Sequence, residues 1–163
     1  MSKYSTTKLA FWAAVALAAE LTLLESWSIK GVRAEALLSL ACFAALFARD
    51  SRQGLLASWM IGLFKDAGSA GPFGLHALLF LAAGWVVLQV RTVLFKESPL
   101  TQLAVAFLAA CWVNVAAALF VCATAGGIPF GVVVGKTLLS ALLTAGLTPF
   151  LHFALANIRW MTR

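Results

Sequence analysis

The stretch GLFKDAGSAGPFG, residues 62–74, interrupts an otherwise apolar chain and decides how it folds. Lys65 and Asp66 stand side by side there, in a sequence that is 63% hydrophobic and only 11% charged. Four glycines and one proline lie within the same 13 residues. Glycine lets the backbone turn tightly, and proline prevents a helix from continuing. The stretch therefore predicts a sharp turn between two helices, the second of which begins with LHALLFLAAGWVVL at residue 75.

The composition around this turn identifies the solvent of the chain. The 163 residues have a mean hydropathy of +0.96. A soluble domain is about half apolar and about a quarter charged, so this chain cannot bury its apolar surface within itself and requires lipid. The formal charge of +6 falls in the gaps between apolar runs, and no nucleic-acid motif accompanies it. We therefore expect an integral membrane protein with no nucleic-acid partner.

Polar residues divide the sequence into six apolar segments. The segments cover residues 9–24, 35–47, 55–64, 75–90, 100–122, and a last run that begins between residues 132 and 137 and ends near residue 158. A transmembrane helix needs about 20 residues, so the second and third segments are short and require cover from neighbouring helices. Period-2 alternation is absent, which argues against a barrel. The sequence predicts an all-α integral membrane protein, a single domain over residues 1–163, with a bundle of about six transmembrane helices and five as the alternative.

Basic residues set the expected orientation. With six spans, the side that holds both termini carries eight Lys and Arg residues, and the other side carries four. The positive-inside rule then places both termini in the cytoplasm and the turn at residues 62–74 on the opposite side. The basic and apolar N-terminus lacks a cleavage site followed by polar sequence, so we interpret it as a retained first span.

Asp66 is the leading candidate for a functional side chain. A carboxylate at the end of a buried helix can bind a partner's cation, titrate or pair internally. The structural alternative is that Asp66 pairs with Lys65 or caps a helix end. Glu20 presents a similar choice, because it either faces the protein interior or lies at the membrane interface.

The remaining polar residues in the apolar runs predict packing rather than chemistry. His76 and His152 are each expected to form a hydrogen bond within the bundle, and Asn114 is expected to bond across helices. No His pair has metal-ligand spacing, and no nucleotide, nucleophile or haem motif is present. Thr148 and Pro149 predict a kink in the last helix. We expect no enzyme activity, no metal and no cofactor.

A second glycine pattern precedes the last span. Gly127, Gly131 and Gly135 recur every four residues, a spacing that lets two helices touch backbone to backbone. Pro129 argues against one continuous helix through this region. We therefore predict close helix packing or a re-entrant entry into the last span, with Lys136 directed outward to the membrane surface.

The sequence GLFKDAGSAGPFGLHALLFLAAGW, residues 62–85, resembles the bacterial rod shape-determining protein MreD family. That family carries Gly-Leu-x-x-Asp, a turn rich in Gly and Pro, and then Gly-Leu-x-x-Leu. The matching positions are Gly62, Leu63, Asp66, Gly71, Pro72, Gly74, Leu75, His76 and Leu78. The chain departs from the family pattern at Lys65, where an apolar residue is usual, and at Ala34–Glu35, where a proline often stands.

The resemblance implies a non-enzymatic scaffold of the cell-elongation machinery in the bacterial inner membrane. It implies contact with MreC, and association with the RodA–PBP2 synthase pair and MreB, during lateral peptidoglycan synthesis. It also implies a bundle similar to the S-component fold of vitamin transporters, so a small-molecule-binding transport subunit is the alternative function. The resemblance assigns partner-binding or structural roles to a few motif residues. These are Gly62, Asp66, Gly71, Pro72, Gly74 and His76.

Overall fold

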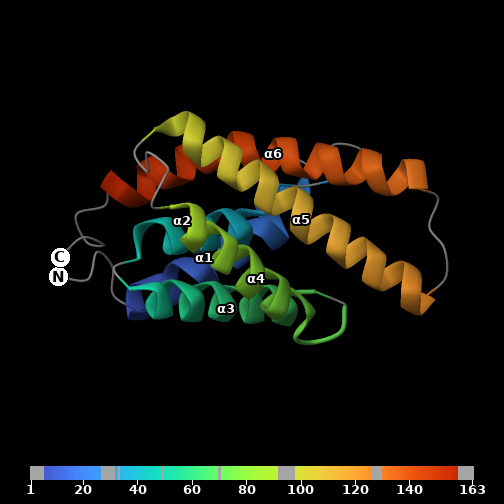
Figure 1. Cartoon of the computed structure of the whole chain (residues 1–163), viewed down its shortest axis with the longest axis horizontal. Helices are drawn as coiled ribbons and strands as arrows, with labels where there is room; N and C mark the ends of the chain where they lie inside the picture. Colours follow the sequence, from blue (N-terminus) through green and yellow to red (C-terminus); the bar gives the residue numbers. More distant parts are fainter. Residues whose placement is uncertain are drawn as a thin grey trace.

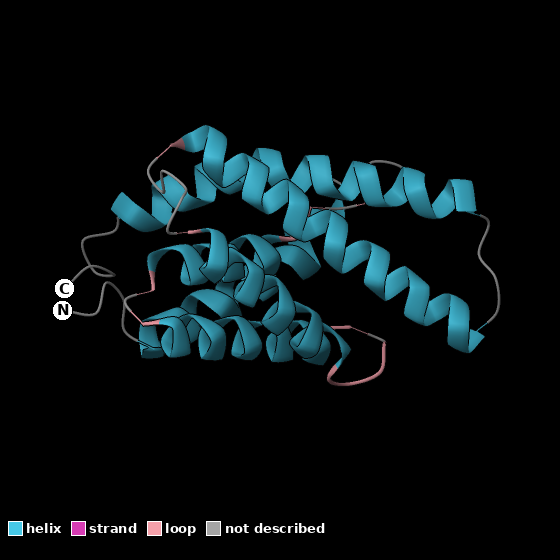
Figure 2. Ribbon diagram, in the orientation of Figure 1, coloured by secondary structure: helices cyan, strands magenta, loops and turns pink. Residues whose placement is uncertain are grey.

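The computed structural model describes residues 6–26, 32, 34–48, 50–69, 71–91, 98–125 and 130–157. Within these ranges the chain forms six helices and no strand, as the ribbon in Figure 2 shows, so the all-α prediction is confirmed. The helices are α1 (Thr6–Ser26), α2 (Ala36–Phe47), α3 (Ser51–Ala67), α4 (Leu75–Val90), α5 (Pro99–Ala125) and α6 (Phe130–Asn157). The number of these helices that cross a membrane stays a prediction.

The helices alternate in direction and form one bundle. In Figure 1, α6 runs along the upper edge, α5 packs on it and descends obliquely toward the lower right, and α1 to α4 lie together below α6. The beginning of α1 and the end of α6 lie at the same end of the bundle, whereas the turn between α3 and α4 lies at the opposite end. The expected placement of residues 62–74 at the end far from the termini therefore agrees with the arrangement of the helices.

Helix α2 is the centre of the bundle. It contacts each of the five other helices, and every residue from Ala36 to Leu46 is buried. The extended backbone at Ala48 and Asp50 then separates α2 from α3, so the basic segment between them is not part of one long helix. With 12 residues, α2 is too short to span about 30 Å of hydrocarbon. The other five helices cover it, as expected for so short an apolar segment.

The outside of the bundle is apolar. Large hydrophobic side chains are exposed along α5 and α6, among them Leu108, Leu119, Phe150 and Phe153. The parts of α5 and α6 at Pro99–Thr124 and Gly131–Leu155 are each long and apolar enough to cross a membrane, and three shorter apolar helices accompany them. Water solvates such a surface poorly, and the acyl chains of a bilayer solvate it well.

Small residues bring α3 and α4 together. On α3, Gly54, Ser58 and Gly62 recur every four residues and are buried. A methyl group built on Gly62 would lie 2.6 Å from the Cα atom of Ala77 and 2.7 Å from the carbonyl oxygen of His76. On α4, a methyl group on Gly84 would lie 2.5 Å from the hydroxyl oxygen of Ser58. The close approach of the two helices therefore depends on glycine, which has no side chain, at positions 62 and 84.

The second glycine pattern does not act in this way. Gly131 and Gly135 lie on an exposed face of α6, and a methyl group on either meets no described atom within 4 Å. Helix α6 is continuous from Phe130, and within the described residues neither glycine brings it against another helix, so the predicted close packing is absent there. The re-entrant entry stays a prediction. Gly127 and Pro129 lie outside the described residues. Lys136 is exposed, as expected for a side chain directed outward.

We expect Gly62→Ala and Gly135→Ala to have opposite effects on stability. The first places a methyl group against the backbone of α4 and should lower the free energy of unfolding by about 1–3 kcal/mol. The second adds a methyl group in open space and should raise stability by up to about 1 kcal/mol, because alanine favours helix more than glycine. Unfolding of the purified protein in detergent measures both effects. Equal behaviour of the two variants would contradict the proposed packing of α3 on α4.

Candidate functional site

The candidate site begins at Asp66, which α3 presents to the start of α4. Asp66 follows Gly62 by four residues and therefore lies on the same face of the helix, the one that packs on α4. The residue is only 3% exposed. The position of this carboxylate thus follows from the small-residue face of α3 described above.

The carboxylate of Asp66 caps helix α4. Its Oδ2 atom accepts hydrogen bonds of 3.0 Å from the backbone N–H groups of Gly74 and Ala77. Its Oδ1 atom accepts one of 3.0 Å from the N–H of His76 and another of 3.0 Å from Nδ1 of the same residue. The first amides of a helix have no partner within the helix, and its N-terminus carries partial positive charge. An ionised carboxylate is therefore the acceptor best suited to this position.

The turn between the helices completes the cap. Gly74 has a φ of +99°, a left-handed conformation that residues with a side chain adopt at a cost. The carbonyl of Pro72 accepts a hydrogen bond from the N–H of Leu75. Gly71, Pro72 and Phe73 are exposed, and Phe73 is 73% exposed. The motif residues at the tip of the turn thus face outward while Asp66 holds the turn from beneath.

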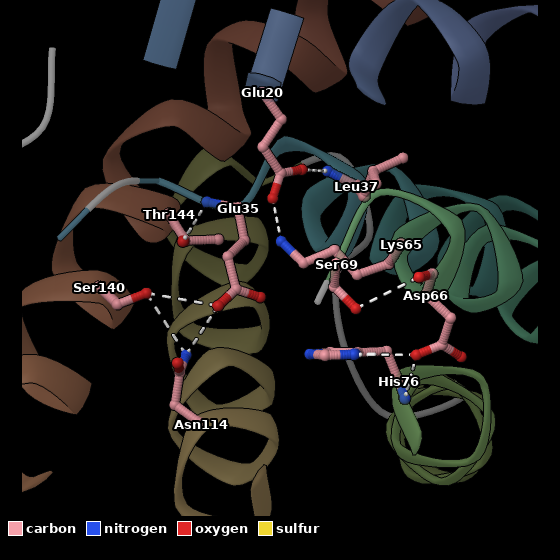
Figure 3. Close-up of polar contacts among 10 residues, drawn as sticks. All are labelled: Glu20, Glu35, Leu37, Lys65, Asp66, Ser69, His76, Asn114, Ser140 and Thr144. Atoms are coloured by element: carbon pink, nitrogen blue, oxygen red, sulfur yellow. Dashed lines mark hydrogen bonds and ion pairs between the residues drawn. The ribbon is translucent and has the colours of Figure 1, made fainter. Parts of the chain in front are cut away.

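Lys65 does not pair with Asp66. Its ammonium group forms a salt bridge with Glu20 of α1, as Figure 3 shows. The other carboxylate oxygen of Glu20 accepts a hydrogen bond of 3.2 Å from the N–H of Leu37 in the first turn of α2. Glu20 is 2% exposed, so it faces the interior of the bundle. Of the alternatives in the sequence analysis, the structure selects the helix cap for Asp66 and the inward position for Glu20.

A third carboxylate, Glu35, connects α2 to the α5–α6 pair. Its Oε1 atom accepts a hydrogen bond of 3.1 Å from the amide of Asn114 and lies 3.5 Å from the hydroxyl of Ser140. Its backbone N–H donates to the hydroxyl of Thr144 at 2.9 Å. The interhelical role expected for Asn114 is thus present, with Glu35 as its partner (Figure 3). Glu35 was not among the candidate residues, although its position directly before an apolar run is a signal of a helix start.

His152 joins α6 to α2 deep in the bundle. Its Nε2 atom donates a hydrogen bond of 3.1 Å to the backbone carbonyl of Ser39, and its ring packs edge-on against Phe43. The expected packing role of this histidine agrees with these contacts. Among the described residues, no group forms a hydrogen bond with the buried Nδ1 atom of this ring.

The arrangement is suited to holding helices together rather than to bond chemistry. Each of the carboxylates of Glu20, Glu35 and Asp66 accepts hydrogen bonds that fix one helix on another. In the described ranges, no three His, Cys, Asp or Glu side chains gather to hold a metal ion. The site is therefore a set of buried carboxylates that connect helices, and residues 71–73 of the turn are its exposed surface.

The described residues also line two apolar grooves elsewhere on the bundle. One, of about 700 Å³, runs between α1 and α3, and the other, of about 410 Å³, lies between α5 and α6. The second contains Val115, Leu119 and Leu138 and has almost no polar atoms in its walls. The first ends in polar residues at the beginning of α3.

We expect Asp66→Ala to destabilise the protein strongly, because it leaves three backbone N–H groups of the α4 start without an acceptor. The loss should reach about 3 kcal/mol or more, given about 1–3 kcal/mol for each buried group left unpaired. Asp66→Asn keeps one acceptor oxygen and should lose less. Asp50 is the matched control, since it stands before α3, is exposed and makes no side-chain cap bond.

Asp50→Ala should therefore change the free energy of unfolding by less than about 0.5 kcal/mol. Hydrogen exchange of the Gly74, His76 and Ala77 amides provides a local measurement. If these amides exchange no faster in Asp66→Ala than in the wild type, Asp66 is not the cap of α4.

Comparison with known proteins identifies the family. The model of the rod shape-determining protein MreD family matches residues 5–157, which is nearly the whole chain. No curated protein and no solved structure matches the chain, so the expected likeness to the S-component fold stays a prediction. The matched residues include the capped turn at Asp66 and all six helices. The chain is a member of the MreD family of rod shape-determining proteins.

Proposed function

We propose that this chain is a non-enzymatic scaffold of the bacterial cell-elongation machinery, which binds an MreC-like protein and supports lateral peptidoglycan synthesis. The family to which it belongs determines rod shape. The observation that carries the proposal is the engagement of Asp66 by three backbone amides and the ring of His76. Asp66, the acidic residue of the motif, holds the turn against α3. This is a structural role rather than a catalytic one.

The fixed turn provides a surface for a partner. Gly71, Pro72 and Phe73 are exposed at the end of the bundle opposite the beginning of α1 and the end of α6. Asp66 ties Gly74 and the start of α4 to α3, so the end of the turn is held within the chain itself. When an MreC-like protein binds this surface, ordering of the turn would therefore cost little conformational entropy.

The proposed place of the chain is the bacterial inner membrane. The excess of basic residues on one side puts both termini in the cytoplasm and residues 71–74 on the other face. In this orientation the turn faces the compartment of the cell wall, and the opposite end of the bundle faces MreB. The RodA–PBP2 synthase pair is the further expected associate within the membrane.

The alternative, a small-molecule-binding transport subunit, has less support. A ligand within the bundle would need polar side chains that are available to bind it, and Glu20, Asn114 and His76 are the candidates. These side chains instead bond to Leu37 and Lys65, to Glu35, and to Asp66. Groups that hold helices together in this way are not free to recognise a ligand.

We expect the wild-type chain to capture its cognate MreC-like protein from solubilised membranes, and to restore rod shape in cells that lack their own copy. The double variant Asp66→Ala/Gly74→Leu should lose both, because the cap is gone and a side chain is forced at a left-handed φ. Gly131→Ala is the control, since an added methyl group there meets no described atom.

The outcome that contradicts the scaffold proposal is a wild-type chain that never captures an MreC-like protein. Tight binding of a vitamin by the purified protein, together with unchanged cell shape after deletion of the gene, would support the transport subunit instead.

A further inference from the structure

Glu35 places a carboxylate halfway along the two longest helices. Its backbone N–H bonds to Thr144 at the middle of α6, and its Oε1 atom bonds to Asn114 near the middle of α5. Both helices are long and apolar enough to cross a membrane. In a bilayer that they span, Glu35 lies near the midplane, where an ionised side chain is costly unless a counter-charge and hydrogen bonds compensate it.

The carboxylate of Glu35 is only half satisfied. Its Oε1 atom has the amide of Asn114 and the hydroxyl of Ser140 as neighbours (Figure 3). Its Oε2 atom is buried, and no described residue forms a hydrogen bond with it. Asp66 and Glu20 differ in this respect, because both oxygens of each have partners. Of these three carboxylates, Glu35 therefore retains one oxygen that can take a further partner.

The negative charge of Glu35 also lacks a counter-charge in the described ranges. The ammonium group of Lys65 is paired with Glu20, and the ring of His76 is bonded to Asp66. A water molecule at Oε2 would supply a hydrogen bond but leave the charge uncompensated. The missing partner is therefore expected to be a cation.

The atoms around Glu35 suit a small monovalent cation. Asn114, Ser140 and Thr144 bring amide and hydroxyl oxygens from α5 and α6 to a single carboxylate. Oxygen ligands bind hard cations, and the number of carboxylates sets the charge that a site holds. The backbone at Glu35 is also non-helical, with φ of −101° and ψ of 89°. Such backbone in the middle of a membrane protein is tolerated where it is buried or lines a cavity, and it is a common element of sodium sites.

We propose that Glu35 binds one sodium ion at the junction of α2, α5 and α6, with Oε2 as the carboxylate ligand. The oxygens of Asn114, Ser140 and Thr144 are the neutral ligands available beside it. The ion holds the start of α2, the central helix, on the two helices that enclose it. Glu35 and Asn114 are each partly exposed, so an ion can reach the carboxylate from outside the bundle. This inference goes beyond the scaffold role and needs no partner protein.

Thermal unfolding of the purified protein in detergent tests the site. The midpoint is compared in sodium chloride and in choline chloride at equal ionic strength and pH, because choline is too large to replace a coordinated sodium ion. Sodium at about ten times its dissociation constant should raise the midpoint by about 3–6 °C. Glu35→Gln keeps the size of the side chain without its charge and should abolish this shift. Asp50→Asn is the matched control and should retain it, since Asp50 is exposed and makes no side-chain cap bond.

Equilibrium binding of radioactive sodium measures the ion directly and does not depend on how well Glu35→Gln folds. We expect one ion per chain for the wild type and for Asp50→Asn. Ser140→Ala removes one of the proposed ligand oxygens and should weaken sodium binding about tenfold.

Equal midpoints of the wild type in the two salts, or a sodium shift that persists in Glu35→Gln, overturn the site. Arg33, two residues before Glu35, lies outside the described residues and is tested in the same way. If the wild type binds no sodium and Arg33→Gln lowers the midpoint as much as Glu35→Gln does, the carboxylate is paired within the chain and the proposal is wrong. The scaffold proposal is tested separately, because none of these measurements involves an MreC-like protein.

Discussion

Every helix that starts in an apolar environment must find acceptors for its first amides, and this requirement organises the protein. A buried N–H group that is left unpaired costs about 1–3 kcal/mol, and more where water cannot reach it. The start of α4 is paired by Asp66 from α3, and that of α2 by Glu20 from α1. Each of these two caps comes from the helix that precedes the capped one, so each cap also holds two consecutive helices together.

The same carboxylates determine which helices lie next to each other. Glu20 also holds Lys65, so α1, α2 and α3 meet at one salt bridge. Glu35 then extends the network to Asn114 on α5, while its backbone reaches Thr144 on α6. Lipid offers little hydrophobic driving force between helices. Polar contacts and close backbone approach therefore supply much of the specificity of the bundle.

The local features of the fold were readable from the sequence, because they depend on neighbours along the chain. The apolar runs predicted the positions of the helices, and Gly74 with Pro72 predicted the turn. The third helix was expected at residues 55–64 and extends over Ser51–Ala67, since its polar ends continue the helix outside the apolar run. The small-residue repeat through Gly54, Ser58 and Gly62 was visible as an i, i+4 pattern, yet the more conspicuous glycines at 127–135 drew the prediction instead.

The long-range partners could not be read in this way. Nothing near Lys65 in the sequence names Glu20 as its partner, and Asp66 directly beside it was the simpler choice. Glu35 and Ser140 are separated by more than a hundred residues, and only packing of α2 against α6 brings them together. Such pairs depend on how all the helices are arranged. The pattern of apolar residues within one segment does not determine that arrangement.

The enclosure of α2 has a consequence for how the protein is made. A ribosome releases α2 and α3 before α5 and α6 exist, and a 12-residue segment is too short to be retained by a bilayer on its own. Enclosure of α2 is therefore complete only after the C-terminal pair has been made, since α5 and α6 supply part of its surroundings. Truncation of the last helix should expose the side of α2 that packs on α6.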